Sequence, residues 1–503
     1  MAHAPELPQC SAREERETTH RVRARQHGTH RLRIPLGALS GHRHLVIGKN
    51  HGIGQQIRVP DNPYDQLAGV YFLQSTGEEI MSQAPLSEPS HPERVRLVAI
   101  DNLRSFLTVL VVAHHAVLAY VSYAPLPFAG WGEEPMAWRA FPVVDTVRAP
   151  ALDLLVGFND AFFMSLFFLV AGLFTWRGLV AKGAIGYLKR RVLRLGVPFA
   201  LSAAVLAQVA YYPAYLQHGG QPGLWSYLGA WLSLDAWPAG PAWFLWVLLA
   251  LSGLAALVYR VAPGWGSRLG ERLRWAGDRP GALFGLLLAI SAAIYMPVTM
   301  LVAPQSWFEL GPFSVQTSRA LHYALYFVFG VGLGGWALEG DGGTGRAGLF
   351  SSEGKLARGW PLWTGLAVIS FVALVACAMA FFGSLKSGTP NETLRRAANF
   401  GFTLSCAASS FMCLSVFLRF GDRTGSLWRS FGRNAFGIYV VHYVFASWTQ
   451  FALLDRPLSA GTKATLVFLA ALLLSWGATI ALRKIPGVAV VVGGRGLHSA
   501  EPK

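Results

Sequence analysis

The chain has 503 residues, of which 53% are hydrophobic and only 14% are charged, and its mean hydropathy is +0.37. Soluble proteins carry about 25% charged residues, so this composition argues against a water-soluble enzyme, a disordered chain and a disulfide scaffold. We therefore expect a polytopic membrane protein. The net charge of +16 would suit a nucleic-acid binder only if the basic residues formed a face with base-reading or stacking elements, and no such pattern is visible.

The first 80 residues differ from the rest in composition. They hold 10 Lys and Arg against 8 Asp and Glu, 7 of the 14 His, and no Trp. They contain no apolar run of spanning length and no signal-peptide pattern. Three interpretations stay open: a functional nucleic-acid or metal-binding module, a disordered tail, or a mis-assigned extension ahead of a true start at Met81, which we favour. We assign 94–490 to a transmembrane domain and 491–503 to a cytoplasmic tail.

Apolar segments of about 20 residues, the length that crosses a bilayer, repeat from residue 97 onward. Each must be a helix because unpaired backbone cannot face lipid. The prediction is thus an all-α membrane bundle of about ten helices. The spans are 97–121, 157–178, 195–216, 241–262, 282–302, 320–338, 361–383, 398–420, 435–454 and 462–482.

The distribution of Lys and Arg between the loops predicts the orientation. With the N-terminus inside, the cytoplasmic loops hold 18 basic residues and the outer loops hold 8, counted with the helix ends. By the positive-inside rule, both termini are cytoplasmic. The two long outer loops at 122–156 and 217–240 carry five tryptophans, which suit either an interfacial aromatic belt or a platform for sugar rings. These are Trp131, Trp138, Trp225, Trp231 and Trp237.

The first span contains ionisable residues, which are costly in lipid and therefore mark candidate sites. Arg104 and His115 are eleven residues apart, so they share a helix face and lie about 16 Å apart along the axis. We expect Arg104 near the cytoplasmic mouth and His115 near the bilayer midplane. Such a histidine could act as a general base, and such an arginine could hold an anionic donor. The alternative is a packing or proton-relay histidine, with Arg104 paired to Asp101.

Further charges lie at the ends of other predicted spans. Arg191 and Arg194 share a helix face before the third span. The positive-inside rule explains them without function, but they could also clamp a phosphorylated cofactor. Asp160, in the second span, is our candidate for the carboxylate that orients His115, because Asp101 is too far down the first helix. Arg319 and His442 are further polar residues of the spans. The cysteines show no metal-like spacing, so we predict no metal site.

Together these residues resemble the integral-membrane acyltransferase family 3. The first span has the Arg-x10-His spacing of that family at Arg104 and His115. The second reads FFLVAG at 167–172, with Ala171 where the family has Ser. The RxxR pair is Arg191 and Arg194, and a WFL segment lies at 243–245. The closing signature G-R-N-x-F-x-I-Y-x-x-H matches residues 432–442. The segment IDNLR, the two adjacent histidines and the FFMSLFF run are similar to the branch named glucan biosynthesis protein C.

This resemblance implies an O-acyltransferase in the bacterial cytoplasmic membrane. Acyl-CoA would be the donor on the cytoplasmic side, with no permanently bound cofactor, and the acceptor would be a hydroxyl of an extracytoplasmic carbohydrate or envelope glycan. His115 would be the base, with Arg104, Arg191 and Arg194 binding the donor. The acyl group, the acceptor and the oligomeric state stay open. A secondary transporter or flippase for a glycan or lipid is the alternative, since intramembrane charges suit it equally. A sensor or scaffold protein is disfavoured.

Overall fold

The computed structural model describes residues 44–47, 55–58 and 98–492, apart from 126–129, 134–135, 337–347 and 423–424. The chain forms two units, Met1–His91 and Pro92–Lys503. In the first unit, β1 (His44–Ile47) pairs with β2 (Gln55–Arg58) in antiparallel register. The predicted start at Met81 and nearly all of the predicted tail lie outside the described residues, so both stay predictions.

The second unit confirms the all-α prediction, since helices make up its described residues apart from loops and one short hairpin, β3 (Trp307–Leu310) with β4 (Phe313–Gln316). Its longer helices are α1 (Val98–Val117), α2 (Pro150–Leu173), α3 (Thr175–Arg191), α5 (Ala207–Gln217), α6 (Leu224–Leu232), α7 (Trp243–Val261), α8 (Trp265–Arg274), α9 (Pro280–Leu301), α10 (Ala320–Gly334), α12 (Trp360–Lys386), α13 (Glu392–Phe420), α14 (Ser426–Ala452) and α15 (Ala460–Leu482). The shorter ones are α4 (Val197–Leu201), α11 (Lys355–Arg358) and α16 (Val488–Val491).

Each of the ten predicted spans coincides with a helix. Within the described residues, 8 helices are long and apolar enough to cross a membrane. The other two predicted spans correspond to α10, which has only 15 residues, and to α14, whose first turns carry Arg429 and Arg433. The protein is therefore a multi-pass helical membrane protein, while the count of ten spans and the cytoplasmic termini stay predictions. Below, the cytoplasmic and outer ends are those of the predicted orientation.

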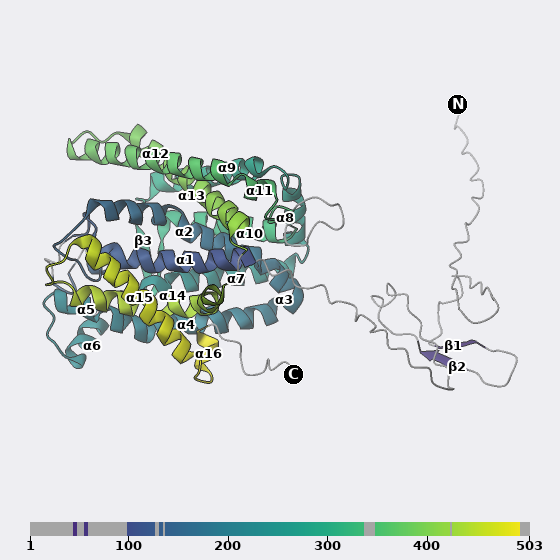
Figure 1. The fold of residues 1–503 in the computed structure, drawn as a ribbon, viewed down its shortest axis with the longest axis horizontal. Helices are drawn as coiled ribbons and strands as arrows, with labels where there is room; N and C mark the ends of the chain where they lie inside the picture. The colour runs from purple at the N-terminus through teal and green to yellow at the C-terminus, as the bar shows by residue number, and fades with distance from the viewer. Residues whose placement is uncertain are drawn as a thin grey trace, which may run out of the picture. The chain divides into compact units, whose positions relative to one another are not determined.

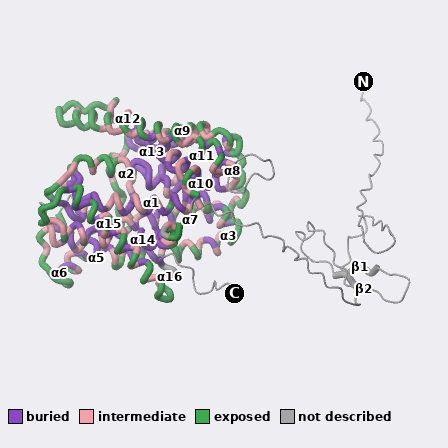
Figure 2. Tube along the Cα trace, in the orientation of Figure 1, coloured by how far each residue is buried: buried purple, intermediate pink, exposed green. Residues whose placement is uncertain are grey.

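Helix α1 is the central element of the bundle. It packs against α2, α13, α14 and α15, and Figure 1 shows it running through the middle of the helices. Its residues alternate between buried and partly exposed positions, whereas α9 and α12 lie at one edge of the bundle and are largely exposed (Figure 2). Such exposed apolar helices suit contact with lipid. Asn102, Ser105 and Thr108 of α1 are buried among the helices that pack against it, whereas Arg104 is exposed.

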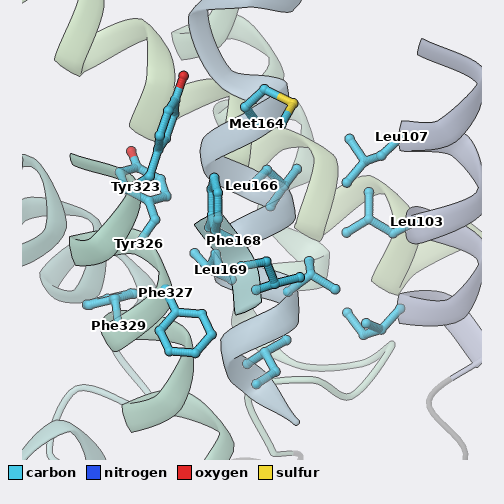
Figure 3. Packing of buried hydrophobic residues seen from close by; sticks show 14 of the residues in the cluster. Leu103, Leu107, Met164, Leu166, Phe168, Leu169, Tyr323, Tyr326, Phe327 and Phe329 are labelled. Carbon is cyan, nitrogen blue, oxygen red and sulfur yellow. The ribbon is translucent and has the colours of Figure 1, made fainter. Parts of the chain in front are cut away.

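Close packing between α2 and α10 explains the glycine of the FFLVAG segment. A Cβ at Gly172 would collide with the Phe327 carbonyl oxygen, and a Cβ at Gly330 would collide with that of Leu169. Small residues let helix backbones approach closely in membranes. Figure 3 shows α2 lying between α10 and α1, with large aromatic and aliphatic side chains filling the space on both sides. This packing fixes the position of α2 against the central helix.

The third predicted span, 195–216, is the second half of a longer helical stretch. A continuous helical stretch runs over Thr175–Gln217, with a backbone break at Gly183, whose φ of 66° favours glycine. Two π-helical turns, η5 (Val192–Gly196) and η6 (Ser202–Leu206), interrupt the α-helical pattern. Turns of this kind occur frequently at functional sites. Arg194 lies in the first of them.

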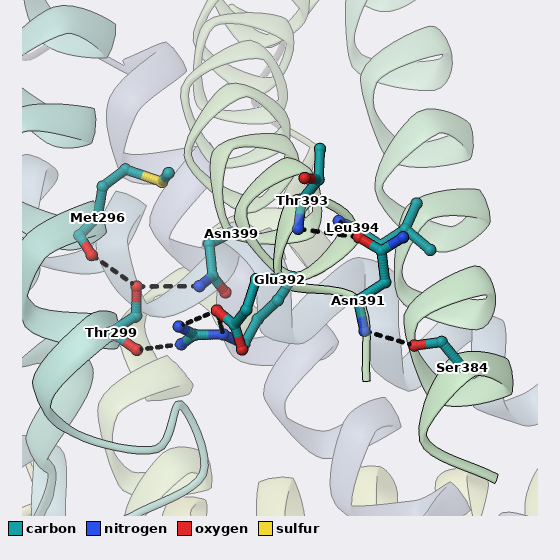
Figure 4. A network of polar contacts seen from close by, with 9 residues as sticks. Met296, Thr299, Ser384, Asn391, Glu392, Thr393, Leu394 and Asn399 are labelled. Carbon is teal, nitrogen blue, oxygen red and sulfur yellow. Dashed lines mark hydrogen bonds and ion pairs between the residues drawn. The ribbon is translucent and has the colours of Figure 1, made fainter. Parts of the chain in front are cut away.

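Polar contacts fix the outer ends of α9 and α13. Asn399 donates from Nδ2 to Thr299 Oγ1 at 3.0 Å, and Arg395 donates from Nη1 to the Thr299 carbonyl at 2.8 Å (Figure 4). Asn391 caps α13 by accepting hydrogen bonds from the backbone N–H groups of Thr393 and Leu394. These hydrogen bonds satisfy backbone groups at the end of α9 and at the start of α13.

A buried ion pair holds the outer loop between α1 and α2. Lys463 Nζ lies 2.7 Å from Asp145 Oδ2, and the two side chains are 0% and 1% exposed. Lys463 also donates to the Leu454 carbonyl at 2.8 Å. The Asp145 backbone N–H donates to the Ala119 carbonyl, so the loop is tied to the end of α1. The loop is therefore part of the folded bundle.

Candidate active site

His115 lies near the outer end of α1. The helical stretch Val98–Tyr120 has its midpoint at residue 109, and His115 is six residues beyond it, or about 9 Å. The position of His115 near the bilayer midplane stays a prediction. The α-helix ends two residues after His115, where the chain turns into the outer loop.

The contacts of His115 fix which ring nitrogen is basic. Its Nδ1 lies 2.8 Å from the carbonyl oxygen of Val111, one turn earlier. A carbonyl oxygen only accepts, so Nδ1 carries the proton and Nε2 carries the lone pair. Among the described residues, no hydrogen bond is made to Nε2, and the residue is partly exposed. His115 is therefore held in the tautomer that a general base needs.

A second histidine supports this arrangement from α14. His442 is fully buried, and its Nδ1 lies 2.7 Å from the Tyr439 carbonyl, which again assigns the proton to Nδ1. Its unprotonated Nε2 lies 3.3 Å from His115 Nδ1 and can share that proton with Val111. The sequence suggested a contact between Tyr439 and His442 but gave no sign of the pair between the two histidines, because 327 residues separate them.

The pair is held by further contacts from α14. Gln450 donates from Nε2 to the carbonyls of His115, at 2.8 Å, and Ala116, at 3.2 Å. The ring of Tyr443 lies edge-on to His115, with centroids 5.1 Å apart. Helix α14 thus fixes both the backbone and the ring of His115.

The three arginines predicted to bind the donor come together at the cytoplasmic end. Arg104 is close enough to Arg191 and Arg194 to be repelled by both. The side chain of Arg104 is 57% exposed, and its ion pair with Asp101 is long, at 4.0 Å. An ion pair with Asp101 is therefore not a sufficient reason for an arginine at position 104. Three neighbouring cations with one distant carboxylate form a site for a polyanion.

Arg191 and Arg194 differ in how they are held. Arg191 donates from Nε to Tyr187 Oη at 2.8 Å and lies within 3.5 Å of Thr175 Oγ1. Both partners are neutral, so they orient the guanidinium without cancelling its charge. Arg194 is exposed on the π-helical turn η5, and among the described residues it makes no hydrogen bond or ion pair. Arg191 is thus fixed in place, whereas Arg194 is open to a ligand.

Asp160 does not contact His115. Its Oδ2 accepts a hydrogen bond from Arg319 Nη2 at 2.7 Å, and its backbone carbonyl accepts one from Nη1 at 3.0 Å. Its nearest histidine is His114, with which it interacts electrostatically. The expected contact of Asp160 with His115 was therefore wrong, because Arg319 occupies the carboxylate and His442 occupies the place beside His115. Whether Asp160 takes part in catalysis stays a prediction.

The outer tryptophans form neither a continuous belt nor a platform. Trp131 and Trp138 stack at 3.9 Å between ring centroids and are 9% and 1% exposed. Trp231 is also buried beside them, at 2%. Only Trp225 and Trp237 are exposed. The buried three fill a small outer core instead. Separately, a cavity beside Tyr439 and Tyr443 is lined by Ser202 and otherwise by apolar residues, four of them alanines.

His115 and Arg104 share helix α1 of a helical membrane bundle, and Arg191 of α3 and Arg194 of η5 lie near Arg104. A histidine with a basic nitrogen and a nearby group of cations is an arrangement typical of an enzyme that transfers a group. The family model described as "Acyltransferase domain" matches residues 97–482. The chain therefore belongs to this acyltransferase family, and it is a membrane acyltransferase that moves groups other than amino-acyl groups. Neither the comparison with curated proteins nor that with solved structures finds a match.

Proposed function

We propose that this acyltransferase moves an acyl group from acyl-CoA, bound at the cytoplasmic face, to a hydroxyl of a carbohydrate on the outer side of the bacterial cytoplasmic membrane. The observation that carries the proposal is the arrangement of α1. A base with a free Nε2 lies near the outer end, and three cations, of which Arg104 has a carboxylate neighbour at 4.0 Å, lie near the cytoplasmic end. The resemblance to the glucan biosynthesis protein C branch supports a glucan as the acceptor.

The arginine cluster fits the phosphates of coenzyme A. Phosphates bind arginine through charge-assisted hydrogen bonds, and repulsion among unpaired cations makes an anion more favourable there. Coenzyme A is too polar to cross a bilayer, but its acyl end hangs on a long, thin arm. With the phosphates at Arg104, Arg191 and Arg194, the thioester would point along α1 toward His115, about 16 Å away.

The chemistry follows from the tautomer of His115. Nε2 takes the proton of the acceptor hydroxyl as the oxygen attacks the thioester carbonyl carbon. The bond between carbon and sulfur then breaks, and the leaving thiolate takes the proton back from Nε2. During this cycle His115 carries a positive charge, which the Val111 carbonyl and His442 Nε2 stabilise through Nδ1–H.

The test uses the purified protein in lipid nanodiscs with acetyl-CoA and a glucan oligosaccharide. We expect a new ester by mass spectrometry and release of free thiol. His115→Ala should lower the rate by about 10²–10⁴-fold, because a general base contributes that much. Its content of folded protein is checked by gel filtration. If folded His115→Ala protein transferred acyl groups at the wild-type rate, His115 would not be the base. Absence of both acetyl-CoA binding and thiol release in the wild-type protein would favour a transporter.

A further inference from the structure

A second polar group lies beside the two histidines of α1, formed by Asp160 of α2 and Arg319, which precedes α10. Asp160 is ten residues from the start of α2, so it lies about 15 Å below the outer end of that helix. Its side chain is nevertheless 46% exposed, whereas that of Arg319 is 10% exposed. A carboxylate at this depth that remains accessible points to an aqueous approach and not to lipid.

The direction of this approach follows from the neighbours of Asp160 on α2. Asp153 lies seven residues earlier and therefore within about 20° of the same helix face. Asp153 accepts a hydrogen bond from the backbone N–H of Ser122 at 2.8 Å, so this face points toward the outer loop after α1. The side chain of Tyr123 in that loop is exposed and interacts electrostatically with Asp160. The approach is therefore from the outer side.

Helix α10, which begins directly after Arg319, is unusually short for a membrane helix. Its 15 residues span about 22 Å, less than the roughly 30 Å of a hydrocarbon core. The β3–β4 hairpin precedes it and is held by the ion pair of Glu309 with Arg139, at 2.5 Å, and by a hydrogen bond from the Trp237 N–H to the Gly311 carbonyl. Arg319 lies in the 3-10 turn η8 (Thr317–Arg319) just before α10, and this turn is in contact with the tethered hairpin.

A row of aromatic rings connects the polar pair to the outer surface. Tyr323, one turn after Arg319, interacts with it directly. The Tyr323 ring lies 5.6 Å from that of Trp243, which lies 5.9 Å from that of Trp307. Trp307, on β3, is 46% exposed. The row therefore begins at the surface on the hairpin and ends at the buried guanidinium.

At its inner end, the polar pair adjoins the reaction site through His114. The His114 ring lies 5.3 Å from the His115 ring, and His114 interacts electrostatically with both Asp160 and Arg319. In the described part of the chain, His114 Nδ1 and Arg319 Nε are buried and have no hydrogen-bond partner. Buried polar atoms without partners are uncommon, and a bound hydroxyl group would satisfy them.

We propose that Asp160 and Arg319 bind one sugar ring of the acceptor and that Trp307, at the surface end of the aromatic row, binds another, while the buried Tyr323 ring supports Arg319 from behind. The carboxylate accepts hydrogen bonds from sugar hydroxyls, Arg319 Nε donates one, and the Trp307 ring contacts the apolar face of the other sugar. Because the ion pair is neutral as a whole, the site favours a neutral sugar over an anionic one. The proposal rests on the proposed function and names where that function holds its acceptor.

The test compares the KM for the two substrates in nanodiscs, with acetyl-CoA as donor and a neutral β-glucan tetrasaccharide as acceptor. Trp307→Ala, at an exposed position, should raise the KM for the tetrasaccharide about three- to tenfold and leave the KM for acetyl-CoA unchanged. Trp225→Ala is the matched control, since Trp225 is 82% exposed on α6 and outside the aromatic row. It should change neither KM.

Equal tetrasaccharide KM values for wild-type and Trp307→Ala protein would overturn the site, as would an equal rise of both KM values. A tetrasaccharide of uronic acids should bind more weakly than the neutral one, and tighter binding would contradict a neutral sugar site. Quenching of tryptophan fluorescence by the neutral tetrasaccharide tests the site without any turnover. Saturable quenching that Trp307→Ala weakens would support the site even if no acyl transfer occurred, in which case only the proposed function would fail.

Discussion

The charges at the two ends of the bundle are arranged in opposite ways. Toward the outer end, the two buried cations of the described residues each have a carboxylate within 2.7 Å, as Lys463 has Asp145 and Arg319 has Asp160. At the cytoplasmic end, Arg104 is repelled by both Arg191 and Arg194, and its carboxylate neighbour Asp101 is 4.0 Å away. We call the outer end compensated and the cytoplasmic end uncompensated. Removing one partner of a compensated pair leaves a buried charge without its counter-ion, whereas a cluster with excess positive charge is unfavourable until an anion binds. Removing charge should therefore have opposite consequences at the two ends.

The largest effect is expected at the compensated end. Lys463→Ala leaves Asp145 buried and unpaired, which should cost about 3–5 kcal/mol of stability. Thermal unfolding in detergent, followed by tryptophan fluorescence, measures the change. Arg358→Ala is the control, because it breaks an ion pair whose side chains are 66% and 58% exposed and which contributes little. An unchanged unfolding temperature for Lys463→Ala would contradict the structural role of the buried pair.

The next effect is expected at the histidine pair. His442→Ala removes the acceptor beside His115 Nδ1 and should lower kcat by roughly 10- to 100-fold, less than the loss of the base itself. His442→Gln keeps an acceptor oxygen and should recover part of the rate. The KM for acetyl-CoA should stay the same in both variants, because the pair lies far from the arginine cluster. A glutamine variant as slow as the alanine variant would reduce His442 to a packing residue.

Sequence patterns predicted the helices well and their contacts poorly. Apolar length alone located α1, α2 and α7, and the spacing of Arg104 and His115 placed both on one helix correctly. The pair of His115 with His442 and that of Asp160 with Arg319 join helices far apart in the sequence, so no local periodicity reports them. We predicted Asp160 as the partner of His115 because a carboxylate often orients a catalytic histidine. The chemical type of a residue, however, does not show which helix it packs against.

At the uncompensated end, removal of charge should impair binding without loss of stability. The double variant Arg191→Ala/Arg194→Ala should raise the KM for acetyl-CoA about tenfold or more and change kcat less, if both arginines bind ground and transition states equally. Its unfolding temperature should stay the same or rise, because repulsion of Arg104 is relieved. Steady-state kinetics and thermal unfolding give both values.

The control for this variant also removes two positive charges, but from neighbouring positions of α3. Lys189→Ala/Arg190→Ala alters two exposed basic residues of α3 that the positive-inside rule explains equally well. It should leave the KM for acetyl-CoA nearly unchanged. Equal effects of the two double variants would mean that general basicity of the face, and not a clamp, attracts the donor. High salt should also raise the KM more for the wild-type protein than for Arg191→Ala/Arg194→Ala.

The smallest effect is expected at an exposed pair near the cytoplasmic end. Arg419 donates to Glu353 Oε1 at 2.6 Å, and this hydrogen bond, with the charge of Arg419, lowers the pKa of Glu353 from its usual 4.5. A carboxyl group with a lowered pKa contributes stability above the pKa of its unfolded state and loses it as the pH falls through the folded value. Glu353→Gln should therefore lower the unfolding temperature by about 1 °C or less at pH 7, because exposed pairs are screened by water. The difference from the wild-type protein should vanish near pH 3, in scans at both pH values. A difference that grew toward acid pH would show that Glu353 opposes folding, and the exposed pair would then behave unlike the compensated pairs of the outer end.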